Sequence, residues 1–144
     1  MLVDLVPDQA AKVQHLSVRT EGGSLIGALV DSDVIAKQFG KKLNPGRWKL
    51  LKSLDAPIAW LDRMEVVKGM RDRGIGTELM KTALDVALEN GARYAILSPR
   101  PERPDDRGQL LRFYDRFGFQ EVLEFDGDKL WDPLLILDLG SQNI

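Results

Sequence analysis

The strongest constraint on the fold is an amphipathic helix that lies between two apolar strands. Residues 77–90 place apolar side chains on one face at helical spacing, and Gly91 follows as a typical left-handed stop. The apolar positions are Leu79, Met80, Ala83, Leu84, Ala87 and Leu88. Residues 57–67 before this helix and 93–98 after it are predicted strands. Strands that alternate with helices are typical of mixed α/β structure.

The C-terminal part extends this pattern with a second helix and two more strands. A short helix is expected over 109–117, and strands are expected over 119–125 and 134–139. An Asp126-Gly127 pair between these strands is typical of a hairpin turn. The sheet is therefore predicted to contain both parallel and antiparallel parts.

The N-terminal part is predicted to contain a β-hairpin. Strands over 13–20 and 24–30 flank the Gly22-Gly23 pair, and a short glycine connection between two strands favours antiparallel pairing.

Residues 34–54 are basic and less regular. Residues 34–39 are typical of a short helix with Asp33 as its N-cap, whereas 47–54 mix helix and strand signals and stay open. The segment contains no acidic residue, so it is a candidate surface for an acidic acceptor, RNA or a protein partner. The alternative is an ordinary solvated face.

Composition narrows the possible chemistry. A chain of 144 residues is about the length of one domain, so 1–144 is expected to form a single one. Cysteine is absent and His15 is the only histidine, which excludes disulfides, a cysteine nucleophile and multi-histidine metal sites. The net charge of -2 argues against general nucleic-acid binding. No apolar run reaches the ~20 residues of a membrane span, so a cytoplasmic protein is expected.

A glycine-containing loop precedes the long helix. It runs from Arg71 to Thr77, and a loop of this kind at a helix N-terminus can hold a phosphate group on backbone N–H groups. A nucleotide P-loop is excluded because Ile75-Gly76 stands where Lys-Ser/Thr is required. A dinucleotide fingerprint is excluded because Leu79 stands at its third glycine. A turn that needs glycine only for its geometry is the other reading.

Two motifs together resemble a known family. The pattern Arg71-x-x-Gly74-x-Gly76 is similar to the acyl-coenzyme A loop of the GNAT superfamily of N-acetyltransferases. The pattern Tyr114-x-x-x-Gly118-Phe119 resembles that family's Y-x-x-x-G-F block. The resemblance covers about residues 58–139. It implies an α/β (α+β) fold with a mixed sheet, splayed central parallel strands and flanking helices.

The resemblance also implies a cosubstrate and a set of site residues. The cosubstrate is acetyl-CoA or another acyl-CoA, and no metal is implied. Tyr114 would protonate the departing thiolate as the general acid. A backbone N–H near Val66 would stabilise the oxyanion of the thioester carbonyl. The expected cofactor-binding residues are Val66, Val67, Arg71, Asp72, Arg73, Gly74, Ile75, Gly76, Thr77 and Ser98.

The general base is left open between two carboxylates and water. Asp62 and Glu65 lie on the strand before the loop, and a separation of three puts them on opposite faces of a regular strand. At most one would then face the cleft, unless a bulge intervenes. For each the alternative is an exposed carboxylate or an ion pair with Arg63. His15 is more typical of a structural histidine.

Two features depart from the family pattern. Arg107 stands where many members carry an asparagine, and the pair of helices expected between the first two strands is not found. The acceptor amine is therefore not identified.

The expected function is acyl transfer from acetyl-CoA to an amine of a small molecule or protein, by a monomer or homodimer. The alternative is a non-catalytic protein of the same fold that binds a partner protein. A nucleotide-binding regulator is a third reading, which the missing Lys-Ser/Thr disfavours.

Overall fold

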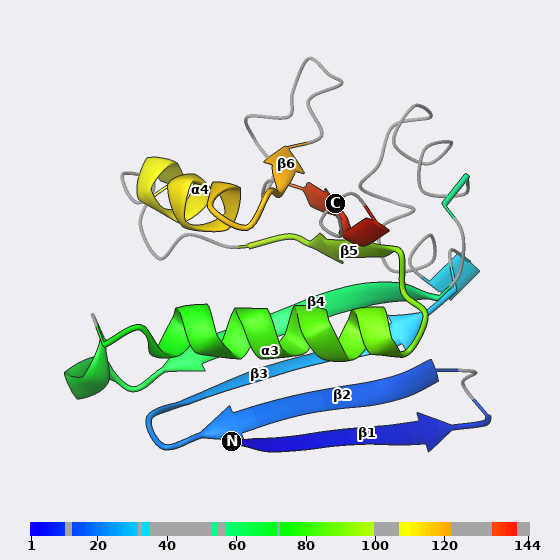
Figure 1. Ribbon diagram of the computed structural model, residues 1–144, viewed down its shortest axis with the longest axis horizontal. Helices are drawn as coiled ribbons and strands as arrows, with labels where there is room; N and C mark the ends of the chain where they lie inside the picture. Colours follow the sequence, from blue (N-terminus) through cyan, green and yellow to red (C-terminus); the bar gives the residue numbers. More distant parts are fainter. Residues whose placement is uncertain are drawn as a thin grey trace.

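The computed structural model describes residues 1–10, 13–31, 33–34, 53–54, 57–71, 73–99, 107–121 and 134–140. Within these residues a seven-stranded sheet has the order β1-β2-β3-β4-β5-β7-β6 (Figure 1). The strands are β1 (Leu2–Asp8), β2 (Val13–Thr20), β3 (Gly23–Val30), β4 (Ile58–Val66), β5 (Tyr94–Leu97), β6 (Gln120–Glu121) and β7 (Leu135–Asp138). The described helices are the 3-10 turn η1 (Lys68–Met70), α3 (Ile75–Glu89) and α4 (Arg107–Asp115).

The sheet is mixed, as predicted. Strands β1 to β4 pair consecutively and antiparallel, and β5 pairs antiparallel with β7, which pairs antiparallel with β6. Strands β4 and β5, which α3 connects, are parallel neighbours. The predicted mixed α/β architecture with parallel and antiparallel parts is therefore confirmed.

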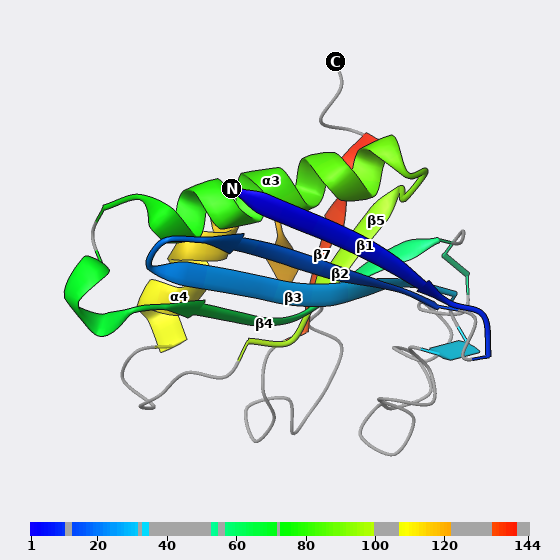
Figure 2. The same cartoon turned by 90° about the horizontal axis from the view of Figure 1, so that it is seen from below.

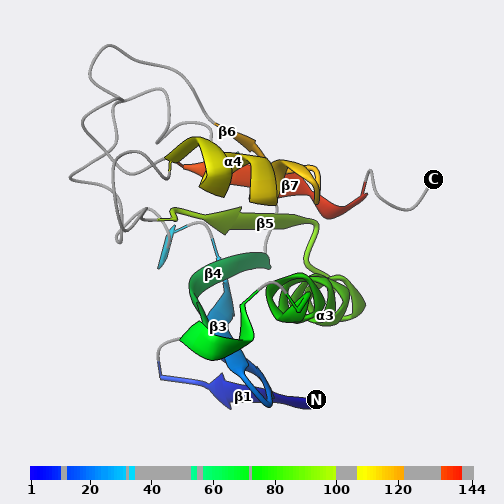
Figure 3. The ribbon, with the colours of Figure 1, turned by 90° about the vertical axis from the view of Figure 1, so that its left-hand side faces the viewer.

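Helix α3 covers one face of the sheet and forms the main core with it. Figure 3 shows the helix end-on beside β3 and β4. Of the predicted apolar stripe, Leu79, Met80, Ala83 and Ala87 are fully buried. They pack against buried side chains of β2 and β3, which are Leu16, Val18 and Leu25. Neither α3 nor α4, the two described α-helices, is long and apolar enough to cross a membrane.

Most of the predicted elements are present with small shifts at their ends. Helix α3 begins two residues before the predicted 77, and α4 begins two residues before the predicted 109. The Gly22-Gly23 hairpin is confirmed, with Gly22 at a φ of 92°. The Asp126-Gly127 turn and residues 35–52 lie outside the described residues.

The N-terminal part contains one strand that was not predicted, and one prediction there was wrong. Strand β1 was not predicted, and it pairs with β2 along its whole length. Asp33 is not an N-cap, because it is itself helical. The carboxylate of Asp31 accepts a hydrogen bond from the Val34 N–H at 3.0 Å, so Asp31 takes that role.

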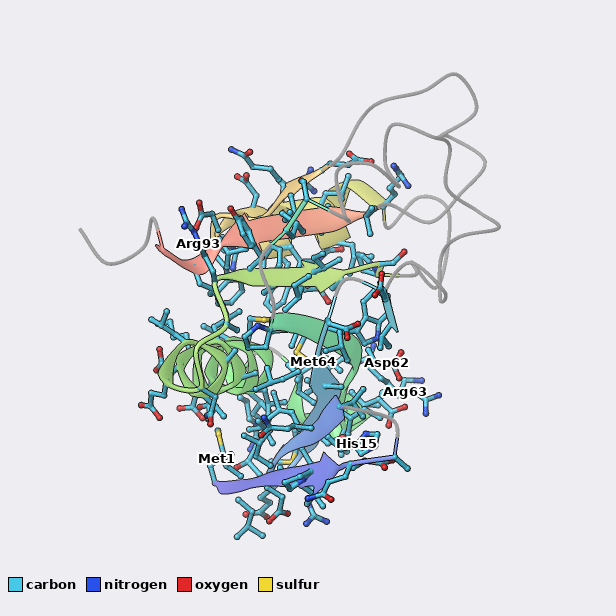
Figure 4. The ribbon with its side chains drawn as sticks, turned by 90° about the vertical axis from the view of Figure 1, so that its right-hand side faces the viewer. Met1, His15, Asp62, Arg63, Met64 and Arg93 are labelled. Carbon is cyan, nitrogen blue, oxygen red and sulfur yellow. The ribbon has the colours of Figure 1, made fainter. Side chains whose placement is uncertain are left out.

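A β-bulge divides β4 into two halves. Ile26 lies opposite Arg63 and Gly27 lies opposite Leu61, so Asp62 is an extra residue in β4. Before the bulge Leu61 packs toward α3, and after it Met64 does. Figure 4 shows Met64 on the α3 side, with Asp62 and Arg63 on the opposite side. The bulge therefore reverses which alternate residues of β4 face the main core.

The bulge depends on a close approach of β3 at Gly27. A Cβ at this position would collide with the carbonyl oxygen of Trp60 and lie 3.2 Å from Cα of Leu61. Backbone atoms cannot move aside cheaply. We expect Gly27→Ala to lower the free energy of unfolding by about 1–3 kcal/mol, measured by urea denaturation. Gly69→Ala is the control, since a Cβ there meets nothing within 4 Å. Equal urea midpoints for the two variants would contradict this account of the bulge.

Candidate functional site

Strands β4 and β5 run together for only a short distance. Their parallel ladder pairs Ile58 to Leu61 with Tyr94 to Leu97, where β5 ends. Strand β4 continues to Val66 and there pairs only with β3 among the described strands. The β5-side edge of the second half of β4 is thus without a strand neighbour in the described part of the chain. This is the splay that the resemblance implied.

A cavity of about 990 Å³ lies where the two strands part. Its wall includes five of the predicted site residues, which are Asp62, Glu65, Arg71, Ser98 and Tyr114. The other lining residues are Leu25, Leu61, Arg63, Met64, Met80, Leu97, Pro99, Gln109, Leu110 and Phe113. Residues from β4, the η1 loop, α3, β5 and α4 therefore meet around one space. The sequence did not assign this second group to the site, although Met80 belongs to the apolar face predicted for α3.

The hydrogen-bond phase of β4 directs two backbone donors toward this cavity. The N–H of Val67 donates to the carbonyl oxygen of Gly22 at 2.7 Å, so this pair faces β3. Because antiparallel strands alternate, the N–H groups of Val66 and Met64 point away from β3, toward the side of β5. Val67 is different from the other predicted residues, because its N–H is already bonded and its side chain is 58% exposed.

The N-terminus of α3 presents further backbone donors. Gly74 has a φ of 76°, and the first bond of the helix runs from the Glu78 N–H to the Gly74 carbonyl oxygen at 3.0 Å. Gly74 has no side chain that could cap this end, so within the described residues the first-turn N–H groups of Ile75, Gly76 and Thr77 can face an anion.

The two arginines of this loop, Arg71 and Arg73, differ in their position relative to the cavity. The Arg71 side chain lines the cavity, whereas Arg73 is exposed and does not line it. Asp72, another predicted binding residue, lies outside the described residues.

The β2–β3 turn contacts the loop that precedes α3, and the sequence did not predict this contact. Besides accepting the Val67 bond, Gly22 lies so close to η1 that a Cβ on it would be 2.7 Å from the sulfur of Met70. The Gly22-Gly23 pair was a visible signal, but it indicated only the hairpin.

Tyr114 is a titratable residue whose pKa is shifted by its surroundings. It is 7% exposed, and its ring makes edge-to-face contacts with Phe113 and Phe119 at centroid distances of 5.0 and 5.9 Å. Burial raises the pKa of the phenol above its ordinary value. The hydroxyl therefore keeps its proton at neutral pH, and Tyr114 is one of the residues that line the cavity.

An ion pair holds α4, the helix of Tyr114, to the sheet. Nη2 of Arg107 lies 2.6 Å from Oε1 of Glu121 on β6, and both side chains are partly buried. A cation at a helix N-terminus is unfavourable by itself, and Glu121 offsets that charge. Arg107 thus has a structural partner at the position where many family members carry an asparagine.

The bulge places Asp62 and Arg63 on the side of β4 opposite Met64. The cavity follows the edge of β4, because residues 61–65 all line it, and both Asp62 and Glu65 are among them. Glu65 forms an exposed ion pair with Arg63, with 3.2 Å between Oε1 and Nε. No ion pair is found for Asp62 among the described residues. His15 lies elsewhere, on β2, with its Nε2 at 3.6 Å from Oδ2 of Asp8.

Comparison with known proteins identifies the family. The model of the acetyltransferase (GNAT) family matches residues 5–119, so the chain belongs to that family. This confirms the resemblance that the sequence motifs indicated. The comparison with curated proteins finds no match.

Solved structures with the same fold share little sequence with this chain. A GNAT acetyltransferase from Staphylococcus aureus Mu50 is 18% identical, with a TM-score of 0.54, over 91% of this chain and 70% of that one. An acetyltransferase from Bacillus cereus is 16% identical, with a TM-score of 0.56, over 92% and 79%. The PaiA N-acetyltransferase from Thermoplasma acidophilum, solved with coenzyme A, is 15% identical, with a TM-score of 0.54, over 88% and 60%. At these identities the likeness establishes the GNAT fold.

The burial of Tyr114 predicts a loss of stability at alkaline pH. The phenol titrates at its ordinary pKa of 10.0 in the unfolded chain and at a higher pKa in the folded protein. Above pH 10 the unfolded state therefore binds fewer protons, and the free energy of unfolding falls as pH rises. Tyr114→Phe removes this contribution, so its urea midpoint should fall less than that of the wild type between about pH 9 and 11. The difference in urea midpoint between the two proteins at pH 7 measures the packing that the substitution itself removes, and it serves as the baseline. Parallel pH profiles for the two proteins would show that burial does not act on this phenol.

Proposed function

We propose that this chain is an acyl-CoA-dependent N-acyltransferase that transfers an acetyl group from acetyl-CoA to an amine of a small molecule or protein. The observation that carries the proposal is the cavity where β4 and β5 part. It brings the Tyr114 phenol and the unpaired edge of β4 around one space, close to the N-terminus of α3. Membership of the GNAT family and the coenzyme A complex of the Thermoplasma relative support it.

The two ends of the cosubstrate would be held by different backbone groups. Its pyrophosphate would lie on the first-turn N–H groups of α3, with Arg71 nearby for charge. Its pantetheine arm would pair with the unpaired edge of β4 as an additional strand, bonding to the N–H groups of Met64 and Val66. Ser98 lies across the cavity at the end of β5, where it can contact the same arm.

The chemistry would follow from these placements. The amine attacks the thioester carbonyl, and the negative charge that develops on the oxygen is stabilised by the Val66 N–H. The carbon–sulfur bond then breaks, and Tyr114 supplies a proton to the departing sulfur. Asp62 is the better placed base for the amine proton, because Glu65 is engaged with Arg63.

Coenzyme binding and turnover test the proposal. Calorimetry should detect acetyl-CoA binding without comparable ATP binding, and a thiol-release assay should show turnover with at least one amine of a broad panel. Tyr114→Phe should lower kcat by roughly 10²-fold while acetyl-CoA still binds, because the phenol acts on the leaving group. Tyr94→Phe is the matched control, since Tyr94 lies on β5 and does not line the cavity.

The outcomes separate the competing functions. Acetyl-CoA binding without turnover on the whole panel would favour a protein that acts by binding a partner. Lack of acetyl-CoA binding would overturn the proposal, and unchanged turnover in Tyr114→Phe would remove that residue from the mechanism.

Gly74 provides a test of the phosphate-binding end. Its φ of 76° is costly for a residue with a Cβ, by about 1–2 kcal/mol. Gly74→Ala should shift the first turn of α3 and weaken acetyl-CoA binding about tenfold, measured by calorimetry. Gly69→Ala, in the same loop without a positive φ, should bind like the wild type. Equal affinity of both variants would argue against pyrophosphate binding at this turn.

A further inference from the structure

Strand β1 forms an exposed edge of the sheet. It lies at one end of the strand order, and Figures 1 and 2 show no other described segment beside its outer side. Its apolar side chains are unusually accessible, with Leu2 67%, Val3 41% and Val6 57% exposed. An apolar strand edge of this kind is a template for pairing with another strand.

The hydrogen-bond phase of the sheet shows which groups of β1 face outward. Val67 and Gly22 are a hydrogen-bonded pair, so Glu65 and Ser24, two residues further along the same register, are one as well. The same alternation can be followed from β3 to β2 and from β2 to β1 through their registers. It shows that the backbone N–H and C=O groups of residues 2, 4, 6 and 8 of β1 face β2. The N–H and C=O groups of Val3 and Leu5 therefore point outward. Pro7 falls in the outward set, where its missing N–H costs the sheet nothing.

We propose that a second copy of this chain pairs with β1, antiparallel, with Asp4 opposite Asp4 of the second copy. In this register Val3 lies opposite Leu5 of the second copy, and each pair exchanges two backbone hydrogen bonds. The two-fold symmetry repeats the pair, so every outward group of Val3 and Leu5 is satisfied. Leu2 lies opposite Val6 of the second copy, which buries the two most exposed side chains of the strand against each other.

The neighbouring registers are worse for identifiable reasons. A shift by two residues in one direction places Leu2 opposite Asp4. A shift by two in the other direction places Asp4 opposite Val6 and leaves the carbonyl of Val3 facing Pro7, which has no N–H to donate. The proposed register sets apolar residues against apolar residues everywhere except at its centre.

The repulsion between the two Asp4 carboxylates at the centre of the interface is reduced by an ion pair within each copy. Nη2 of Arg19 lies 3.2 Å from Oδ2 of Asp4, so each Asp4 arrives with its own cation. The interface then holds two arginines and two aspartates, with no net charge.

This pairing leaves the candidate site accessible and does not depend on its function. The two-fold axis is perpendicular to the sheet, so both copies of α3 lie on the same face. Strands β2 and β3 separate β1 from β4, and the cavity lies beyond β4. The dimer would therefore form whether or not the chain transfers acyl groups.

Sedimentation of the full chain tests the surface. The wild type should sediment as a dimer at about 100 µM, and Val6→Lys should sediment as a monomer. Val67→Lys is the matched control, because Val67 is 58% exposed against 57% for Val6 and lies far from β1; this variant should remain a dimer. A monomeric wild type, or a dimeric Val6→Lys, would overturn the proposal.

Cross-linking tests the register itself, since the chain contains no cysteine of its own. Opposed residues of a non-hydrogen-bonded pair have Cα atoms about 4.5 Å apart, within the range of a disulfide. Asp4→Cys should therefore form a dimer through a disulfide under mild oxidation. Asp8→Cys, on the same strand and similarly exposed, should not, because the register places no Asp8 opposite another. Equal cross-linking of the two variants would overturn the register even if the dimer exists.

Discussion

The parting of β4 from β5 is the constraint on which the candidate site depends. Four residue pairs hold the two strands together, and beyond them β4 pairs with β3 alone among the described strands. A sheet interior normally satisfies both edges of every strand, so this interruption leaves backbone donors that another molecule can use. Tyr114 lines the cavity where the two strands part.

The bulge at Asp62 makes this interruption compatible with a packed core. By reversing the alternation of β4, it keeps Leu61 and Met64 on the side of α3 while Asp62 and Glu65 both border the cavity. The same strand thus contributes apolar side chains to α3 and carboxylates to the cleft. At the bulge, β3 approaches the Trp60 carbonyl so closely that Gly27 has no room for a Cβ.

The sequence predicted the parts of this structure that carry a strong period or motif. Helix α3, strands β4 and β5 and the GNAT resemblance followed from apolar spacing and from the Gly74 and Tyr114 motifs. Strand β1 was missed because its apolar residues are exposed at an edge, so its sequence lacks the usual alternation of buried and polar residues. The sequence allowed a bulge in β4 but did not predict one, since a bulge depends on how closely β3 and β4 approach. The Arg107–Glu121 pair was missed because it joins residues of two elements whose packing no local pattern specifies.

The bond from Val67 to Gly22 has a consequence for how the chain can be divided. The family motifs lie between residues 58 and 139, yet the loop at their centre rests on a turn near residue 22. The main core is shared in the same way, because α3 packs on Leu16, Val18 and Leu25. A fragment that began at β4 would keep both motifs but lose the surface on which the loop and helix are held. The N-terminal hairpin is therefore part of the structure that holds the candidate site, and not an addition to it.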